Sequence, residues 1–317
     1  MVRILTLDEI STLLGDVDLL QEMERAFTAY SAGKVQVPPV GELLFPGAKG
    51  EAHIKYGAIQ GGEHFLVKIA TGFFDNPLQG LPPFGGCMLL FSQKTGQVEA
   101  VLLEEGNLTN LRTAAAGAVA AKYLAPSTVT RIGIVGTGVQ GRLQADFLRT
   151  VTPCRDLAVW GRDKSKAEAA ARDIAAMGYQ ASVADSVREL ARSCNLIVTT
   201  TAASLPILHD ADVAPGTHIT AMGSDTREKI ELEPALVRRA DIVVVDSLSQ
   251  SLERGEAYQA FRAAPSDRAR VVELGSVIAG QAKGRTDDNQ ITIADLTGVA
   301  AQDIAIAEAI YHRSLRR

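Results

Sequence analysis

The pattern of apolar and polar positions changes once along the chain, at about residue 130. Before this point, two helical patterns precede a series of strand-like runs separated by tight turns. After it, apolar runs alternate with helical patterns. Strands joined by short turns are typical of an antiparallel sheet, whereas alternating strands and helices are typical of a parallel one. We therefore expect two domains of different architecture within the 317 residues.

The first region is predicted to be an α+β domain. Thr6 and Glu9 have capping-box spacing ahead of a short helix. A longer helix from about Val17 has one apolar face, formed by Leu19, Leu20, Met23, Ala26 and Phe27. Five runs predict an antiparallel meander over residues 42–45, 52–59, 64–74, 86–92 and 98–103. A helix rich in small residues follows over 108–124, with Asn107 as its expected cap.

The second region predicts a doubly wound parallel sheet, so the expected fold class is α/β. Strand patterns fit residues 131–135, 157–160, 181–183, 196–200, 218–222 and 242–245. Helical patterns lie between most of them, as at 164–177 and 187–193.

The end of the chain is expected to return to the first domain. Near Ile291 the pattern becomes antiparallel-like again, and a helix begins at Val299 and ends at about His312. Packing of this segment on the first region would make that domain discontinuous and leave a cleft between the domains. The expected domains are 1–125 with 290–317, and 126–289.

A glycine loop marks the start of the second domain. Apolar residues of the strand 131–135 lead into a Gly-x-Gly-x-x-Gly sequence, and an amphipathic helix follows. Gly136 permits the tight turn, Gly138 lets the backbone approach a pyrophosphate, and Gly141 lets the helix pack close to the strand. This pattern favours a Rossmann-type dinucleotide site, although glycine loops also form ordinary turns. The expected contacts here are Gly136, Thr137, Gly138, Val139 and Gln140.

Two further loops follow strands of the predicted parallel sheet, at the edge where such folds bind ligands. Their residues are expected to line the cofactor groove: Thr199, Thr200, Thr201, Met222, Gly223 and Ser224. Asp225 could hydrogen-bond a substrate amino or imino group, and the alternative is a turn or a helix cap. Lys229 is either a phosphate contact or a surface lysine.

The end of the second predicted strand bears on the choice of cofactor. An acidic residue there favours the free 2′-hydroxyl of NAD, and an arginine favours the 2′-phosphate of NADP. The segment Gly161, Arg162 and Asp163 contains both residue types. These residues therefore leave the choice between NAD and NADP open.

Basic residues in the first domain could bind an anion. His53 and Lys55 lie two apart on one predicted strand and share a face. Lys68 lies in a strongly apolar run, so its ammonium must reach water, a carboxylate or a ligand. A lysine on an edge strand is an equal alternative.

Arg112 and Thr113 fall in the first turns of the small-residue helix, where the helix dipole favours an anion. The guanidinium of Arg112 can hold a carboxylate or phosphate through two parallel hydrogen bonds. The alternative is a salt bridge to Glu104 or Glu105.

Composition and charge argue against several classes of protein. A net charge of −5 without a basic cluster argues against nucleic-acid binding. No segment approaches the roughly 20 apolar residues of a membrane span, and an acidic N-terminus argues against a secretory signal. Three widely spaced cysteines, Cys87, Cys154 and Cys194, favour a reduced, cytoplasmic protein without disulfides or a metal site.

Several separated motifs together resemble the ornithine cyclodeaminase/mu-crystallin family over nearly the whole chain. They are Leu108-Thr109-Asn110-Leu111-Arg112-Thr113-Ala114-Ala115, the glycine loop 136–140, Gly223-Ser224-Asp225-Thr226 with Lys229 and Glu231-Leu232, and Thr297-Gly298-Val299-Ala300-Ala301-Gln302-Asp303. The resemblance implies a two-domain homodimer whose first domain supplies the substrate contacts and the dimer sheet.

The resemblance also implies roles for individual residues. Lys68 and Arg112 match substrate-binding positions, and Asp225 matches the catalytic aspartate. The implied cofactor contacts are Arg112, Thr113, the glycine loop, Lys229 and Thr297.

The chain departs from the cyclodeaminase pattern at Val40, Pro83 and Arg227-Glu228. The arginine expected in place of Val40 would hold a carboxylate, so its loss weakens the case for ornithine as substrate. The segments 53–57 and 68–77 resemble a different branch, which includes ectoine-utilisation proteins and the iminosuccinate reductase of the β-hydroxyaspartate pathway. His53 and Lys55 are then candidates to hold a second carboxylate.

The resemblance therefore implies an NAD(P)H-dependent imine reductase of a small 2-imino acid, with iminosuccinate to L-aspartate as the leading reaction. It favours NAD as the cofactor, and Arg162 leaves NADP possible. Arg112 and Lys68 would fix the α-carboxylate, and Asp225 would stabilise the iminium. Two alternatives stay open: an ornithine cyclodeaminase that uses bound NAD, and a mu-crystallin-like protein that binds a cofactor and a small ligand. Dehydrogenase activity on another amino acid, such as alanine, would differ only in the side-chain pocket.

Overall fold

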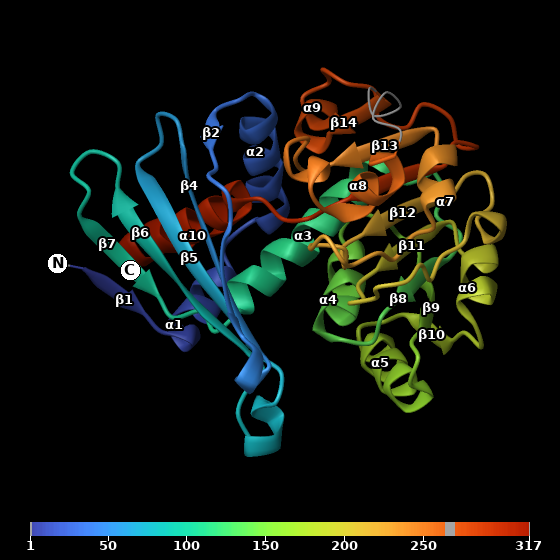
Figure 1. Ribbon diagram of the computed structural model, residues 1–317, viewed down its shortest axis with the longest axis horizontal. Coiled ribbons are helices and arrows are strands. Elements are labelled where there is room, and N and C mark those ends of the chain that lie inside the picture. The colour runs from blue at the N-terminus through green and yellow to red at the C-terminus, as the bar shows by residue number, and fades with distance from the viewer. Residues whose placement is uncertain (1, 264–269, 317) are drawn as a thin grey trace. The chain divides into compact units, whose positions relative to one another are not determined.

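The computed structural model describes residues 2–263 and 270–316, which divide into two compact units (Figure 1). Unit 1 comprises Met1–Arg112 and Val299–Arg317, and unit 2 comprises Thr113–Gly298. None of the described helices is both long enough and apolar enough to cross a membrane.

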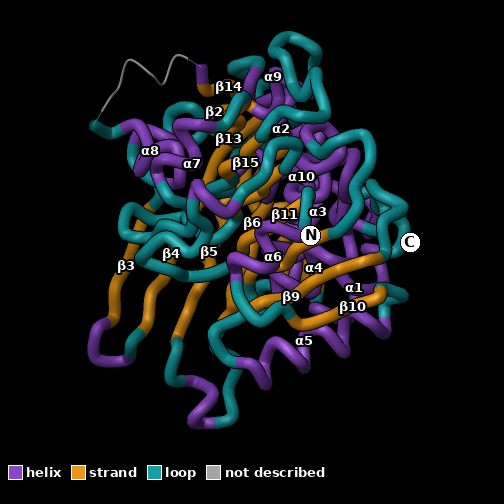
Figure 2. Tube along the Cα trace, turned by 90° about the vertical axis from the view of Figure 1, so that its right-hand side faces the viewer, coloured by secondary structure: helices purple, strands orange, loops and turns teal. Residues whose placement is uncertain are grey.

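Unit 1 is built on one mixed sheet in the order β1-β7-β6-β5-β4-β2, with β3 also paired to β4. Its elements are β1 (Arg3–Leu5), α1 (Leu7–Leu14), α2 (Leu19–Ser31), β2 (Val35–Gln36), β3 (Gly41–Phe45), β4 (Gly50–Ile59), β5 (His64–Phe73), β6 (Phe84–Ser92), β7 (Val98–Leu102) and α10 (Ala300–Leu315). The antiparallel pairing of β3 to β7 confirms the predicted meander. Its strands β3, β4 and β5 lie side by side in Figure 2. The parallel strand β1 was not predicted, because three residues are too few for a periodic pattern.

One face of the sheet in unit 1 is covered by helices. α10 packs against β4, β5, β6 and α2. The predicted apolar face of α2 is confirmed, since Met23, Ala26 and Phe27 are buried. Along β5, alternate residues such as Leu66 are buried on this side, while Phe65 on the opposite side stays partly exposed. The face of the sheet opposite the helices is therefore apolar along β5 and partly exposed to solvent in the single chain.

Unit 2 is a sheet with helices on both faces. Its elements are β8 (Ile132–Val135), α4 (Val139–Leu148), β9 (Asp156–Trp160), α5 (Lys164–Ala176), β10 (Gln180–Val183), α6 (Val187–Ser193), β11 (Leu196–Thr199), β12 (His218–Ala221), α7 (Pro234–Arg239), β13 (Ile242–Val245), α8 (Gly255–Phe261), β14 (Val271–Glu273), α9 (Leu274–Ile278) and β15 (Thr292–Asp295). The order is β10-β9-β8-β11-β12-β15-β13-β14, and every described pairing is parallel. One apolar core contains residues of α4 and α5, and the other contains residues of α6, α7 and α8. The predicted doubly wound sheet is confirmed.

The expectation of an antiparallel segment near Ile291 is wrong. β15 lies between β12 and β13 and is parallel to both. All four of its residues are buried, yet Thr292 and Asp295 at its ends are polar. Thr292 donates to the carbonyl of Leu124, 2.9 Å away. Because its ends are polar, this strand lacks the continuous apolar run that is typical of a buried parallel strand. The hydrogen-bond partner of Thr292 is also far away in sequence.

The helix α3 (Asn107–Leu124) crosses the boundary of the units after Arg112. Its later part packs in unit 2, where the side chain of Gln144 on α4 donates to the carbonyl of Thr113. Asn107 is the first residue of this helix and not its cap. The buried carboxylate of Glu104 accepts from the backbone N–H of Thr109 at 3.2 Å and caps the first turn instead.

Candidate functional site

A buried ionic cluster lies in unit 1 between β5, α3 and α10. Lys68 as a residue is 1% exposed. Its ammonium lies 2.8 Å from one carboxylate oxygen of Asp303. Nε of Arg112 lies 3.0 Å from the other oxygen. Arg112 also donates to the side-chain oxygen of Gln302, which is fixed in turn by the backbone N–H of Val299 at 2.9 Å. Arg112 therefore pairs with Asp303, and not with Glu104 or Glu105 as the alternative interpretation had it.

The register of the sheet adds two more basic residues to the face that carries Lys68. Lys55 lies directly opposite Lys68, and His53 lies opposite Ala70. The prediction that His53 and Lys55 share a face is confirmed, because successive side chains of a strand alternate between faces. His53 also forms an ion pair with Glu51 at 3.5 Å if its ring is protonated.

The charges of this cluster act strongly on one another. Burial lowers the pKa of Lys68 to about 7, with further lowering by Arg112 and Lys55, although Asp303 opposes the shift. Burial raises the pKa of Asp303, but Arg112, Lys68 and Lys55 outweigh it and hold that pKa below its usual value. Two cations, Lys68 and Arg112, thus share the single carboxylate of Asp303, so these three groups carry an excess of positive charge when Lys68 is protonated.

Asp303 and Gln302 were not assigned roles from the sequence. Asp303 stands among apolar residues of α10 such as Ala301 and Ile304, all of them buried. A carboxylate surrounded by apolar neighbours needs a cation or hydrogen-bond donors, and Lys68 is a lysine in an apolar run that needs a partner in the same way. A lysine and an aspartate, each among apolar residues, were the signal in the sequence that could have identified this ion pair.

The glycine loop of unit 2 has the predicted local geometry. Gly136 has a φ of 129°, which only glycine adopts readily. A Cβ atom on Gly141 would lie 2.5 Å from the carbonyl oxygen of Gly136, so helix α4 packs against the turn. A Cβ on Gly138 would meet no atom within 4 Å, and no side chain caps α4 there. Thr137 lies in the turn, and Val139 and Gln140 are the first residues of α4. Open backbone at an uncapped helix N-terminus fits a pyrophosphate.

The loops after β11 and β12 lie side by side, because the two strands pair in parallel register. Both the N–H and the hydroxyl of Thr200 donate to the carbonyl of Val135, which joins the first of these loops to the glycine loop. Thr201 and Gly223 both donate backbone N–H groups to the carboxylate of Glu231. Met222 and Ser224 flank Gly223 in the second loop.

Asp225 and Lys229 form a pair at the end of the second loop. Their charged atoms are 2.6 Å apart, and both side chains are partly exposed. The hydroxyl of Ser224 donates to the carbonyl of Lys229 and closes the turn. Thr297 is buried and donates to Asp246 at 3.1 Å.

In the segment after β9, Arg162 and Asp163, which left the choice between NAD and NADP open, have different surroundings. Asp163 caps α5, since its carboxylate accepts from the N–H of Lys166 and from the hydroxyl of Ser165. Arg162 is exposed, and Gly161 packs against Thr137. The guanidinium of Arg162 is thus accessible, whereas the carboxylate of Asp163 has a structural role.

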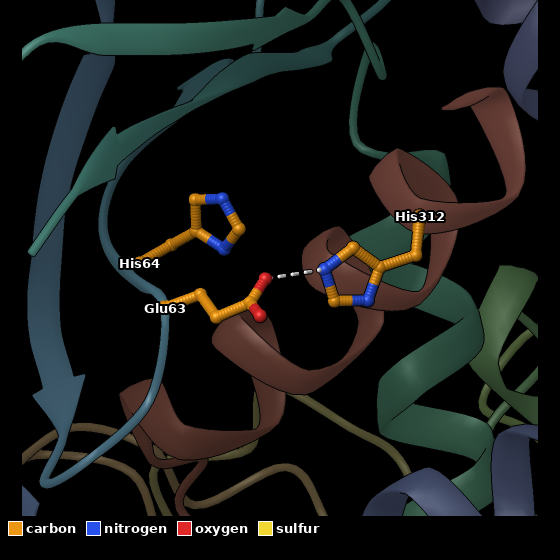
Figure 3. Close-up of side chains that lie close together, drawn as sticks. All are labelled: Glu63, His64 and His312. Carbon is orange, nitrogen blue, oxygen red and sulfur yellow. Dashed lines mark hydrogen bonds and ion pairs between the residues drawn. The ribbon is translucent and has the colours of Figure 1, made fainter.

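A separate cluster in unit 1 brings together Glu63, His64 and His312, the one group within residues 2–263 and 270–316 with three neighbouring metal-ligating side chains (Figure 3). His312 lies 3.2 Å from Glu63. The two ring nitrogens of buried His64 lie 3.0 Å from Glu308 and 2.9 Å from Glu99. Because both His64 nitrogens already contact carboxylates, we interpret the cluster as a hydrogen-bond network that holds the end of α10 against the sheet.

Comparison with known proteins places this geometry in a family. The chain matches the ornithine cyclodeaminase/mu-crystallin family over residues 2–317. It is 43% identical to an uncharacterized cyclodeaminase of Sinorhizobium fredii, covering 100% of this chain and 97% of that protein. It is 39% identical to the iminosuccinate reductase of Paracoccus denitrificans, covering 95% and 93% of the two chains.

Solved structures agree with this assignment. The crystal structure of the Paracoccus denitrificans iminosuccinate reductase with NAD+ superposes with a TM-score of 0.91, at 31% identity over 99% of this chain and 97% of that one. An archaeal alanine dehydrogenase dimer with bound NAD gives a TM-score of 0.90, at 33% identity over 99% and 96%. The chain therefore belongs to the ornithine cyclodeaminase/mu-crystallin family.

Proposed function

We propose that this protein is an NAD(P)H-dependent reductase of a small 2-imino acid, with iminosuccinate to L-aspartate as its leading reaction. The observation that carries the proposal is the buried cluster of Lys68, Arg112 and Asp303, whose excess positive charge suits a carboxylate. The relatives named reductases and dehydrogenases support the reaction class.

Arg112 and Lys68 hold the α-carboxylate of the substrate. Asp303 contacts both cations, so it fixes their direction and partly opposes the lowering of the Lys68 pKa by burial. A fixed pair of cations orients the substrate before the reaction and removes orientational entropy from the barrier. Lys55 or His53, on the same face of the sheet, holds a second carboxylate, which favours a dicarboxylic imino acid.

The residues of unit 2 fit a dinucleotide. The glycine loop holds the pyrophosphate, while Thr200, Thr201, Met222, Gly223 and Ser224 line the other half of the cofactor. Thr113, Arg112, Lys229 and Thr297 are further proposed contacts, and Arg162, with Gly161 beside it, faces the ribose and admits NADPH as well as NADH. When bound, the reduced nicotinamide supplies a hydride to the imine carbon.

Asp225 stabilises the protonated imine nitrogen. A carboxylate beside the nitrogen favours the iminium, which accepts a hydride more readily than the neutral imine. The ion pair with Lys229 holds this carboxylate at the end of the loop. The C=N double bond becomes a C–N single bond as the carbon gains a hydride and the nitrogen gains a proton, so one hydride and one proton are consumed.

We also propose that the protein is a homodimer. The uncovered face of the unit 1 sheet carries partly exposed apolar residues, including the stacked rings of Phe65 and Phe91. An apolar sheet face of this kind is typical of an interface between copies. The archaeal relative is a dimer, which supports the proposal, and sedimentation velocity would test it.

A second candidate is an ornithine cyclodeaminase, because a 43% identical relative bears that type of name. Such an enzyme releases ammonia from ornithine with bound NAD and consumes no external NADH. A mu-crystallin-like binding protein would bind NAD(P)H without either activity.

The distinguishing experiment measures oxidation of NADH and of NADPH in the presence of oxaloacetate and ammonia, which form iminosuccinate, alongside ammonia release from ornithine. Cofactor oxidation that depends on both oxaloacetate and ammonia supports the reductase. Ammonia release from ornithine without cofactor consumption contradicts it and favours the cyclodeaminase.

A further inference from the structure

One buried carboxylate in unit 2 has no role in the proposed reaction. Glu231 is fully buried, and its carboxylate accepts four hydrogen bonds. The donors are the hydroxyl of Thr199 at 2.6 Å, the N–H and hydroxyl of Thr201 at 2.6 and 2.8 Å, and the N–H of Gly223 at 2.8 Å. These donors belong to the ends of two neighbouring strands, β11 and β12.

The four bonds divide evenly between the two oxygens of Glu231. Each oxygen accepts from one backbone N–H and one threonine hydroxyl. A hydroxyl can rotate to suit a different partner, but a backbone N–H cannot. Both oxygens of Glu231 must therefore be acceptors. A glutamine at this position would always place its NH2 group against one of the two backbone N–H donors, in either orientation of the amide.

The backbone of Glu231 is itself fixed. Its N–H donates to one oxygen of Glu256 on α8 at 2.7 Å, and the N–H of Leu232 donates to the other at 3.1 Å. The loops also touch directly, since a Cβ on Gly223 would lie 2.0 Å from the carbonyl oxygen of Thr201. Glu231 is thus the acceptor that holds two closely packed loops in one arrangement.

In a doubly wound fold, the first strands hold the adenosine half of a dinucleotide and the strands beyond the switch point hold the nicotinamide half. The glycine loop follows β8, whereas Glu231 ties the loops after β11 and β12. We propose that Glu231 is a positioning residue that orients the nicotinamide half of the cofactor and leaves binding of the adenosine half unchanged. This inference rests on the proposed function.

The test compares three variants with the wild type in the full-length protein. Glu231→Gln puts a donor against a fixed N–H, and Thr199→Val removes one of the four donors at nearly constant volume. Glu233→Gln is the matched control, because it makes the same change two residues along, at a carboxylate that accepts from Asp210. The measurements are kcat for imino acid reduction and the Kd values of NADH and of ADP-ribose, which lacks the nicotinamide.

Glu231→Gln is expected to lower kcat by on the order of 10- to 100-fold, as misplacement of a reacting group does. Its Kd for ADP-ribose stays within about twofold of the wild type, so the preference for NADH over ADP-ribose falls. Thr199→Val changes the same quantities in the same direction but less, and Glu233→Gln changes neither. A purely structural role would weaken ADP-ribose and NADH binding together.

Two results would overturn the inference: an unchanged kcat in Glu231→Gln, or equal losses of ADP-ribose and NADH affinity. If Glu231→Gln does not fold, Thr199→Val decides by the same two criteria. If the wild type binds NADH but reduces no imino acid, the proposed reaction fails, while the ratio of the NADH and ADP-ribose Kd values still tests Glu231.

Discussion

Two sets of buried carboxylates, Asp303 in unit 1 and Glu231 with Glu256 in unit 2, are satisfied in different ways. In unit 1, the Asp303 carboxylate faces the cations Lys68 and Arg112 directly. In unit 2, the buried carboxylates of Glu231 and Glu256 accept hydrogen bonds from backbone N–H groups. Two cations around one carboxylate leave a positive charge that an anionic ligand can pair with. Backbone amides satisfy the hydrogen bonds of a carboxylate and fix the local chain. We therefore expect the unit 1 cluster to bind an anion and the unit 2 carboxylates to hold loops in place.

The largest expected effect comes from breaking the unit 1 pairing. Asp303→Ala leaves two buried cations without their shared partner, so it should lower the free energy of unfolding by about 3–5 kcal/mol. Urea denaturation measures this change. The control is Asp173→Ala, which removes a partly exposed ion pair with Arg142 and should change stability by less than about 1 kcal/mol. Equal losses in the two variants would contradict the comparison.

The next effect concerns catalysis. Arg112→Ala should lower kcat/KM by an amount equivalent to about 2–4 kcal/mol, because a bidentate contact to the substrate carboxylate is lost. Arg112→Lys keeps the charge but not the planar pair of donors, so it should recover only part of the loss. Near-normal turnover in Arg112→Ala would remove Arg112 from the site.

The lowered pKa of Lys68 should make both catalysis and stability depend on pH. Since burial lowers its pKa to about 7, kcat/KM should fall as pH rises above about 7, when the ammonium loses its proton. Lys68→Arg keeps its charge and should not have this alkaline limb. Folding responds in the opposite direction: the lowered pKa makes stability rise between about pH 7 and 10.5, since the unfolded chain binds more protons there. An alkaline limb that persists in Lys68→Arg would assign it to another group.

The smallest effect concerns the cofactor. Arg162→Ala should lower kcat/KM with NADPH by up to about tenfold and leave the value with NADH nearly unchanged, because only NADPH offers a phosphate to an arginine there. Asp163 is not expected to set the preference, since it caps α5. Equal losses with both cofactors would contradict the assignment of Arg162.

Local features of unit 2 could be predicted from the sequence, because the glycine turn and the strand it follows are adjacent in the chain. The position of β15 could not, since parallel strands pair across long connections and nothing in 292–295 encodes its neighbours. Lys68 could be singled out as a lysine in an apolar run. Its partner Asp303 lies at the other end of the chain, and only the packing of α10 on the sheet brings them together.

The most direct test of the carboxylate-binding cluster is calorimetric titration of the wild type, in the presence of NAD+, with L-aspartate, L-alanine and β-alanine. L-Alanine lacks the distal carboxylate of aspartate, and β-alanine lacks the α-carboxylate. The account predicts that L-aspartate binds best and that β-alanine does not bind measurably. Binding of β-alanine as tight as that of L-aspartate would contradict it.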